Sequence, residues 1–341
     1  MKPLLGLAFF CALAVPAGAQ NASWNAPLGI SLESVIYPAP VHFLPLKNGG
    51  QDVRMAYMDA PSQVFALRTV KPKTPVLLLH GKNFGGYYWG NVVRRLNREG
   101  FRVIVPDQIG FGKSSKPDIP YSFGMLADNT VKLLDTLKIP KVMVVGHSMG
   151  GMLATYLAAH YPTRVERLVL ENPIGLEDYG KATGKVPLEK LYANELKDTN
   201  PAKIRAFYKN YFHTWKEKFG YLTQIRIRVT KSGEYPRWAK SSAQTYKMIL
   251  EQPVVDEFAK VRAPSLLIIG QSDRTVVGKN YMRPEVARQF GNYPALGVRT
   301  MRRMKNAIEV EIPNTGHIPH LESPATYEDA LKRFLLADLK Q

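Results

Sequence analysis

The chain has 341 residues, of which 45% are hydrophobic and 22% charged, so it can bury the core of one large domain with a smaller appended one. Its formal net charge of +18 favours anionic partners such as acidic substrates, lipid headgroups or envelope polymers. The sequence contains no helix-turn-helix pattern, zinc-finger spacing or RNP-like aromatic stretch, so we expect no nucleic-acid binding and interpret the basic charge as an aid to solubility.

The first residues have the pattern of a secretory signal peptide. A basic residue, Lys2, precedes an apolar run over 4–15 and an Ala17-Gly18-Ala19 cleavage site. The apolar run is too short to span a bilayer, so we expect an exported protein, periplasmic or secreted after cleavage near Ala19, without stable membrane insertion. The only cysteine, Cys11, lies within this segment. The mature chain, expected to begin at Gln20, would therefore form no disulfide and use no thiol chemistry.

Strands and helices alternate through the next part of the chain. Segments 41–46 and 53–58 read as a hairpin of two strands, because a turn of the Asn-Gly-Gly type separates them. The continuous apolar run 76–79 predicts a strand covered on both faces, as in a parallel sheet. A helix over 91–99 and a strand over 101–106 then establish a β-α-β rhythm.

A sharp turn at Gly146-His147-Ser148-Met149-Gly150 carries the clearest chemical signal. It joins an apolar strand over 142–145 to a helix over 149–161 that Pro162 stops. A G-x-S-x-G turn between a strand and a helix exposes the serine hydroxyl, and the glycines leave room for the backbone to cross. The simpler interpretation, a serine that only caps the helix, does not account for this context. Ser148 is the predicted nucleophile.

A second glycine-rich loop is expected to face this serine. It follows the strand 76–79 and reads His80-Gly81-Lys82. The backbone N–H groups of Lys82 and Met149 would converge on a carbonyl oxygen as it becomes negative, each worth about 3 kcal/mol. We therefore predict an oxyanion hole built from these two backbone groups, with no required role for the Lys82 side chain.

These motifs together resemble the α/β-hydrolase superfamily, in its serine-nucleophile branch with a helical cap. The resemblance rests on His80-Gly81, on Asp107 with Gly110 and Gly112, and on the turn 146–151. It implies a mostly parallel central sheet flanked by helices, and a catalytic triad in the chain order Ser, acid, His. Asp107 precedes the nucleophile, so it is expected to shape its loop rather than serve as the acid.

The strand-helix rhythm is interrupted after a predicted strand over 165–170. The region from 176 to 261 is helix-like, aromatic and basic, with 16 Lys and Arg residues against 10 Asp and Glu. We interpret it as a cap inserted into the hydrolase core, whose basic face either is simply solvated or attracts anionic substrates. The predicted division is a signal peptide at 1–19, a first core part at 20–175, a cap insertion at 176–261 and a second core part at 262–341.

Within the cap, aromatic residues recur every four positions. Phe207, Tyr211, Trp215 and Phe219 would share one face of a single helix. Phe207, Tyr211 and Trp215 are the predicted lining of an apolar acyl pocket. Packing of a cap helix on the core is an equal alternative.

The resemblance places the acid and the base in the last part of the chain. Asp273 matches the family's Gly-x-x-Asp position after a predicted strand over 265–270, with Asp178 as the alternative. His317 follows Gly316 on the loop after the last predicted strand, as the family pattern implies, and His320 is its alternative. The other motif histidines, His80 and His147, are expected to be structural.

The predicted function is that of a carboxylesterase-like serine hydrolase. Its expected substrate is a small, ester-like molecule, either neutral or anionic. Ser148 would form an acyl-enzyme from an ester or lactone, with His317 as the base and Asp273 orienting it. This chemistry needs no metal or organic cofactor, and no zinc-ligand spacing is evident. The alternative substrates are amides, thioesters and diketones cleaved at a carbon-carbon bond. The alternative functions are a cofactor-free haloperoxidase, a lyase and a noncatalytic binding protein. A serine at position 148 argues against the superfamily chemistries that use an aspartate nucleophile.

Overall fold

The computed structural model describes residues 25–62 and 72–337. The predicted signal peptide at 1–19 lies outside these ranges. Within them, no helix is both long and apolar enough to cross a membrane.

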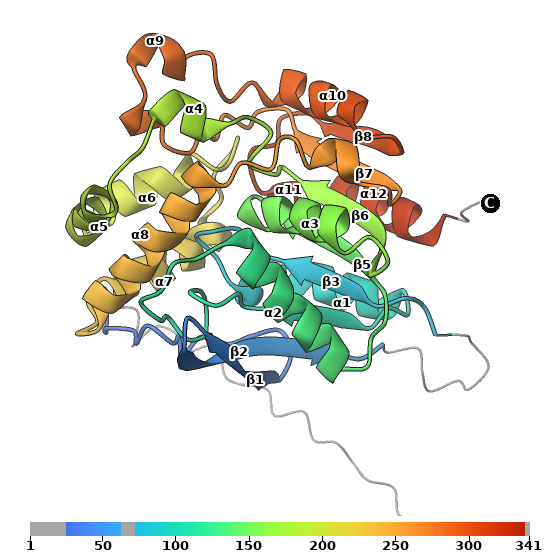
Figure 1. The fold of residues 1–341 in the computed structure, drawn as a ribbon, viewed down its shortest axis with the longest axis horizontal. Helices are drawn as coiled ribbons and strands as arrows, with labels where there is room; N and C mark the ends of the chain where they lie inside the picture. The colour runs from blue at the N-terminus through green and yellow to red at the C-terminus, as the bar shows by residue number, and fades with distance from the viewer. Residues whose placement is uncertain (1–24, 63–71, 338–341) are drawn as a thin grey trace, which may run out of the picture.

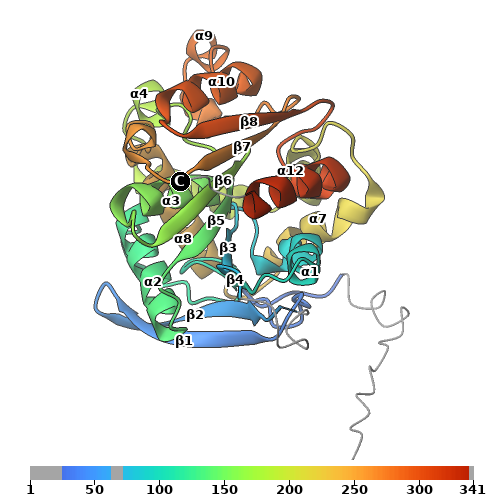
Figure 2. The same cartoon turned by 90° about the vertical axis from the view of Figure 1, so that its right-hand side faces the viewer.

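A single sheet of eight strands forms the centre of the described chain (Figures 1 and 2). The strand order is β1-β2-β4-β3-β5-β6-β7-β8. The β1–β2 hairpin and the β2–β4 pair are antiparallel, whereas every pair from β4 to β8 is parallel. The strands are β1 (Val41–Asn48), β2 (Gln51–Ala60), β3 (Val76–Leu79), β4 (Val103–Pro106), β5 (Val142–His147), β6 (Val165–Glu171), β7 (Ser265–Gly270) and β8 (Ala307–Ile312).

Helices cover both faces of this sheet, so each face has its own hydrophobic core. Strand β3 shows the division, because Leu77 and Leu79 join one buried cluster while Val76 and Leu78 join the other. Helices α2, α3 and α10 pack in the first cluster, and α1 and α12 in the second (Figure 2). The bounds are α1 (Gly90–Arg98), α2 (Phe123–Thr136), α3 (Met149–His160), α10 (Tyr293–Arg303) and α12 (Pro324–Leu336).

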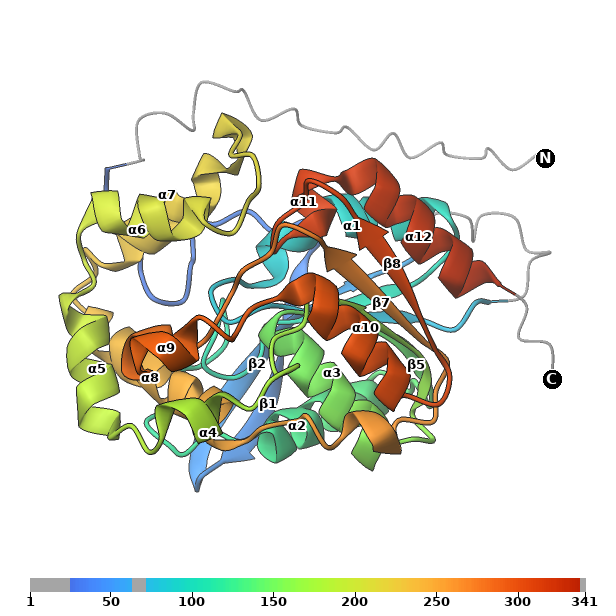
Figure 3. The same cartoon turned by 90° about the horizontal axis from the view of Figure 1, so that it is seen from above.

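The insertion between β6 and β7 is helical, as its sequence suggests. Its helices gather at one end of the molecule, on the left in Figure 3. They are α4 (Tyr179–Thr183), α5 (Leu188–Lys197), α6 (Pro201–Lys209), α7 (Gly220–Val229) and α8 (Tyr235–Glu251). Short helical turns complete the described chain at Gly86–Trp89, Glu217–Phe219, Phe258–Lys260, Lys279–Tyr281, α9 (Pro284–Ala287) and α11 (Pro319–Glu322). The predicted fold class, a mostly parallel sheet flanked by helices, is confirmed.

Candidate active site

Ser148 occupies a strained turn between β5 and α3. Its φ of 56° and ψ of −121° lie outside the regions that non-glycine residues usually adopt. The flanking glycines are needed for close packing: a Cβ at Gly146 would lie 2.3 Å from the Gly150 carbonyl oxygen, and one at Gly150 would lie 2.2 Å from that of Leu79. The turn therefore holds the serine against the end of β3.

Three side chains from distant parts of the sequence meet at this turn. The Nε2 atom of His317 lies 2.9 Å from the Ser148 hydroxyl, and its Nδ1 atom lies 2.6 Å from Oδ2 of Asp273. All three are buried, with exposed fractions of 7% for Ser148, 1% for His317 and 2% for Asp273. One imidazole thus bridges a hydroxyl and a carboxylate, the arrangement that activates a serine.

The Asp273 carboxylate is held ionised by its neighbours. Burial alone would raise its pKa, but the His317 ring and hydrogen bonds from His317 and Thr275 hold the pKa below its ordinary value. The Thr275 backbone N–H donates to Oδ1 at 2.8 Å. Because the second oxygen already accepts from His317, this carboxylate is fixed on both sides.

Asn172 completes this cradle and was not predicted from the sequence. The side-chain N–H of Asn172 donates to Oδ2 of Asp273 at 2.8 Å, and its side-chain oxygen, Oδ1, accepts from the Gly270 N–H, also at 2.8 Å. Asn172 directly follows β6. Asp273 lies on the loop after β7, which is the strand next to β6 in the sheet. Its place after a neighbouring parallel strand was the signal available in the sequence.

His317 is positioned by its backbone and by an aromatic ring. Its N–H donates to the Tyr211 carbonyl at 2.6 Å, and the Tyr211 ring stacks on the imidazole with centroids 5.0 Å apart. Its own carbonyl lies 2.8 Å from Nε2 of His147. These contacts fix the loop that follows β8.

A buried hydrogen-bond chain extends from this loop to the other side of Ser148. Tyr88 accepts from the Gly81 N–H at 3.0 Å, and its hydroxyl lies 2.9 Å from Nδ1 of His147. Burial lowers the pKa of His147 well below its ordinary value, so the ring is neutral and can accept at Nδ1 while donating from Nε2 to His317. His147 is therefore a structural link, in agreement with the sequence expectation, and Tyr88 is a contributor that the sequence did not indicate.

The proposed oxyanion residues flank the serine. Met149 is the first residue of α3, immediately after Ser148. On the other side, a Cβ at Gly81 would lie 3.0 Å from Cβ of Ser148, so the residue before Lys82 packs against the serine. The Lys82 side chain donates to the Ser242 hydroxyl at 2.8 Å.

The alternative acids and bases have other partners. Asp178 caps α4 through the Lys181 N–H at 3.1 Å. His320 pairs instead with Glu171, with Nδ1 at 2.8 Å from Oε1, in a site with no exposure. Asp107 shapes its loop as expected, because it accepts from the backbone N–H groups of Gly86 at 2.6 Å and Lys113 at 2.7 Å and from the Tyr37 hydroxyl at 2.6 Å.

The prediction of one aromatic helix face in the cap is wrong. Helix α6 ends at Lys209, and the chain then turns, so Phe207, Tyr211 and Trp215 do not share a face. Tyr211 packs on His317, as described above, and Trp215 packs on Phe212 and Phe219. Of the three predicted lining residues, only Phe207 borders the cavity described next.

The turn has a physical cause in the contacts of its backbone. The Tyr211 carbonyl must reach the His317 N–H, and the N–H groups of His213 and Thr214 donate to the Glu322 carboxylate at 3.2 and 2.6 Å. These bonds to another part of the chain replace the helical ones, and tertiary contacts commonly override a periodic pattern in this way.

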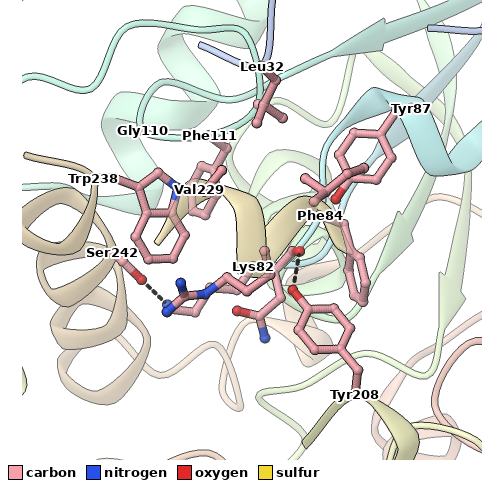
Figure 4. Close-up of a pocket in the computed structure, with 14 residues that line it drawn as sticks. Leu32, Lys82, Phe84, Tyr87, Gly110, Phe111, Tyr208, Val229, Trp238 and Ser242 are labelled. Atoms are coloured by element: carbon pink, nitrogen blue, oxygen red, sulfur yellow. Dashed lines mark hydrogen bonds between the residues drawn. The ribbon is translucent and has the colours of Figure 1, made fainter. Parts of the chain in front are cut away.

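A cavity of about 550 Å³ lies between the cap and the loop after β3. It is bordered by Lys82 and the next residue, Asn83, whereas Ser148, Asp273 and His317 are not among its lining residues. A smaller cavity of about 40 Å³ adjoins the same two residues; Figure 4 shows Lys82 crossing it toward Ser242. A space of several hundred Å³ is enough for a small organic substrate. Among the described residues, no group of three or more His, Cys, Asp or Glu side chains is arranged to hold a metal ion.

Comparisons with known proteins agree with this fold. The family model for the alpha/beta hydrolase fold matches residues 74–324. The crystal structure of a probable hydrolytic enzyme from Pseudomonas aeruginosa PAO1 is 40% identical, with a TM-score of 0.87, over 93% of this chain and all of that one.

Curated relatives match over shorter stretches. A Caenorhabditis elegans abhydrolase domain-containing protein is 38% identical over 32% of this chain and 25% of its own length. The 2-hydroxymuconate semialdehyde hydrolase of a Pseudomonas species is 39% identical over 30% of this chain and 37% of its own length. The chain spans a quarter to a third of the length of the first curated relatives it matches. Since the family model covers most of the chain and the sheet has the expected order, the protein belongs to the α/β-hydrolase fold family.

Proposed function

We propose that this protein is an exported serine hydrolase that cleaves an ester or lactone of a small or medium-sized substrate through an acyl-enzyme. The observation that carries the proposal is the unbroken chain from Ser148 through His317 to Asp273, with heavy-atom distances of 2.9 and 2.6 Å. Export is supported by the signal-peptide pattern of residues 1–19.

In the first half-reaction, the Ser148 hydroxyl attacks the substrate carbonyl carbon while His317 Nε2 takes its proton. The carbonyl oxygen becomes negative and is met by the backbone N–H groups of Lys82 and Met149, aided by the N-terminus of α3. When the tetrahedral intermediate collapses, the leaving alkoxide receives the proton from His317. The ionised Asp273 stabilises the imidazolium throughout.

In the second half-reaction, a water molecule gives a proton to His317 and attacks the acyl carbon. Collapse releases the carboxylic acid and returns the proton to Ser148. An ester or lactone is favoured because its leaving group departs readily, and the cavity beside Lys82 has room for such a molecule.

Cleavage of a carbon-carbon bond in a diketone is the second candidate function. One observation favours it, namely the local likeness to the 2-hydroxymuconate semialdehyde hydrolase of a Pseudomonas species. The same serine, histidine and aspartate would serve this reaction.

The test is hydrolysis of 4-nitrophenyl esters from acetate to decanoate, and of a small lactone panel, by the mature protein and by Ser148→Ala. We expect the substitution to lower kcat by at least about 10⁴-fold, because it removes the nucleophile. Labelling of the unsubstituted protein by a fluorophosphonate provides a control that does not depend on the substrate. Turnover that persists in Ser148→Ala, or intact protein that resists labelling, would contradict the proposal. Labelling with no ester or lactone turnover, but with diketone cleavage, would favour the second candidate.

A further inference from the structure

A buried arginine with unused hydrogen-bonding capacity borders the cavity next to Lys82. Arg226, on α7, is only 8% exposed and borders both the large and the small cavity. Its Nη2 atom donates to the Tyr235 hydroxyl at 3.1 Å, and its guanidinium lies 4.2 Å from the centre of the Trp238 ring. Its Nη1 atom donates to no acceptor among the described residues. A buried, unpaired donor of a cation is costly unless a ligand satisfies it.

The acidic neighbours of Arg226 leave Nη1 without an acceptor. Nη2 donates to the Asp198 backbone carbonyl at 3.4 Å, and the carboxylate oxygens of Glu195 and Asp198 lie 3.9 and 4.0 Å from it, beyond hydrogen-bond distance. Lys82 and Lys203 also border the large cavity. Three cationic side chains therefore face two carboxylates, which leaves an excess of one positive charge.

Lys82 supplies a second cation at the same cavity. Its ammonium donates one hydrogen bond, to Ser242, and lies 5.3 Å from the Tyr246 ring centre (Figure 4 shows the bond to Ser242). An ammonium has three donors, so two remain for other acceptors. Burial lowers the pKa of Lys82 from its ordinary value, and a bound anion would offset this cost.

We propose that Arg226 and Lys82 bind a carboxylate group of the substrate, so that the enzyme prefers esters that carry one negative charge on the acyl chain or on the leaving group. This inference rests on the proposed serine hydrolase function and names its substrate class. A singly charged carboxylate matches the single excess positive charge of the cavity wall. Nη1 of Arg226 and the Lys82 ammonium each have donors left for its oxygens. The contact of Arg226 with the Trp238 ring holds the guanidinium in place.

The test compares matched substrates in which a terminal methyl group is replaced by a carboxylate. Mono(4-nitrophenyl) adipate is paired with 4-nitrophenyl hexanoate to test the acyl side. For the alcohol side, 4-(butanoyloxy)butanoate is paired with butyl butanoate and acid release is followed by titration. We expect kcat/KM for the charged member of at least one pair to exceed that of the neutral member about tenfold or more.

Arg226→Gln is expected to lower this charged-to-neutral ratio by about 10- to 100-fold, as loss of a hydrogen bond to a charged group implies. Lys82→Met is expected to lower it in the same direction, and Arg226→Lys to restore part of it. Arg205→Gln is the matched control. Arg205 is exposed on α6, so this substitution removes one positive charge outside the cavity. The ratio should stay unchanged in this control.

A measurement on the unsubstituted protein avoids any dependence on how the variants fold. Adipate should inhibit hexanoate ester hydrolysis more strongly than 1,6-hexanediol does. Ratios near one in both substrate pairs, with Ser148-dependent turnover of the neutral esters, would overturn the carboxylate inference and leave the hydrolase function standing. Absence of Ser148-dependent turnover with every substrate would instead overturn the hydrolase function itself.

Discussion

Asn172 is the residue on which the geometry of the candidate acid depends most directly. It donates to the same Asp273 oxygen that faces His317, and it is anchored by the Gly270 N–H. Its φ of 33° is unusual for a side-chain-bearing residue but common for asparagine. The local backbone conformation therefore suits an asparagine and aims its amide at the carboxylate.

Asn172→Asp should impair the site and change its pH dependence. The new carboxylate would replace an N–H donor next to Asp273, so the two acids would share a proton and the pKa of the pair would rise. Orientation of His317 needs an ionised Asp273. As the pH is lowered, the variant would therefore lose activity at a higher pH than the unsubstituted protein does. We expect kcat/KM to drop by about 10- to 100-fold at pH 7 and the acidic limb of its pH profile to move upward.

The measurement is kcat/KM for a neutral ester between pH 5 and 9. Asn172→Ala is the control, since it removes the donor without adding a charge and should lower kcat/KM without moving the acidic limb. An unchanged limb in Asn172→Asp would show that Asn172 does not act through the carboxylate.

Among the residues of the candidate site, those that lie in local motifs were predicted from the sequence. Ser148 lies in a G-x-S-x-G turn, and the resemblance supplied Asp273 and His317. Asn172 and Tyr88 were missed because their roles come from contacts 101 and 59 residues away along the chain. The place of Asn172 after a strand could be read from the sequence, but no local pattern identifies the distant partner of either residue.

Strand β8 shows how an element can contradict its own hydrophobic pattern. Ile308 is 56% exposed, whereas the neighbouring Glu309 is half-buried against α10, where a Cβ at Gly297 would lie 2.0 Å from its Oε1 atom. Burial, with a smaller effect of Glu311, raises the pKa of Glu309 to about 7. The pairing of β8 with β7 over Ala307–Ile312 places this acid against the helix.

Glu309→Gln should therefore stabilise the protein at alkaline pH. The folded pKa of about 7 lies above the ordinary value of 4.5, so the stabilisation from the protonated carboxyl is complete below pH 4.5 and is lost as pH rises through 7. Glutamine keeps the neutral form at every pH. We expect Tm to rise by about 1–3 °C at pH 8.5, and by less at pH 5.5.

Thermal unfolding at these two pH values checks this prediction. The exposed Glu189→Gln on α5 is the control and should change Tm equally at both. If Glu309→Gln shifts Tm by the same amount at pH 5.5 and 8.5, ionisation of Glu309 does not carry the effect.

Over the whole molecule, continuous apolar runs such as 76–79 and 142–145 predicted the parallel sheet, because strands covered on both faces are apolar along their whole length. The contacts between cap and core could not be predicted. Lys82 bonds to Ser242 across 160 residues, and Asn83 to Tyr211 across 128. These bonds depend on how α8 and the turn after α6 come to lie over the loop after β3, which composition and periodicity do not specify.

The net charge of the whole chain should add a long-range contribution to substrate capture. The formal charge of +18, which becomes 18 − 1 = +17 once the predicted signal peptide with Lys2 is removed, creates a positive field that attracts anions. Salt screens this field, because it shortens the Debye length from about 20 Å at 20 mM to about 4 Å at 500 mM. We expect kcat/KM for mono(4-nitrophenyl) adipate to fall by about 3- to 10-fold across this range of NaCl, while the value for 4-nitrophenyl hexanoate changes little. Arg226→Gln should keep most of this salt dependence while lowering kcat/KM for the adipate ester, because it removes one local charge from a largely distributed field. Parallel salt curves for the two esters would show that the basic surface has no part in capture, and would leave any preference for the charged ester to the cavity alone.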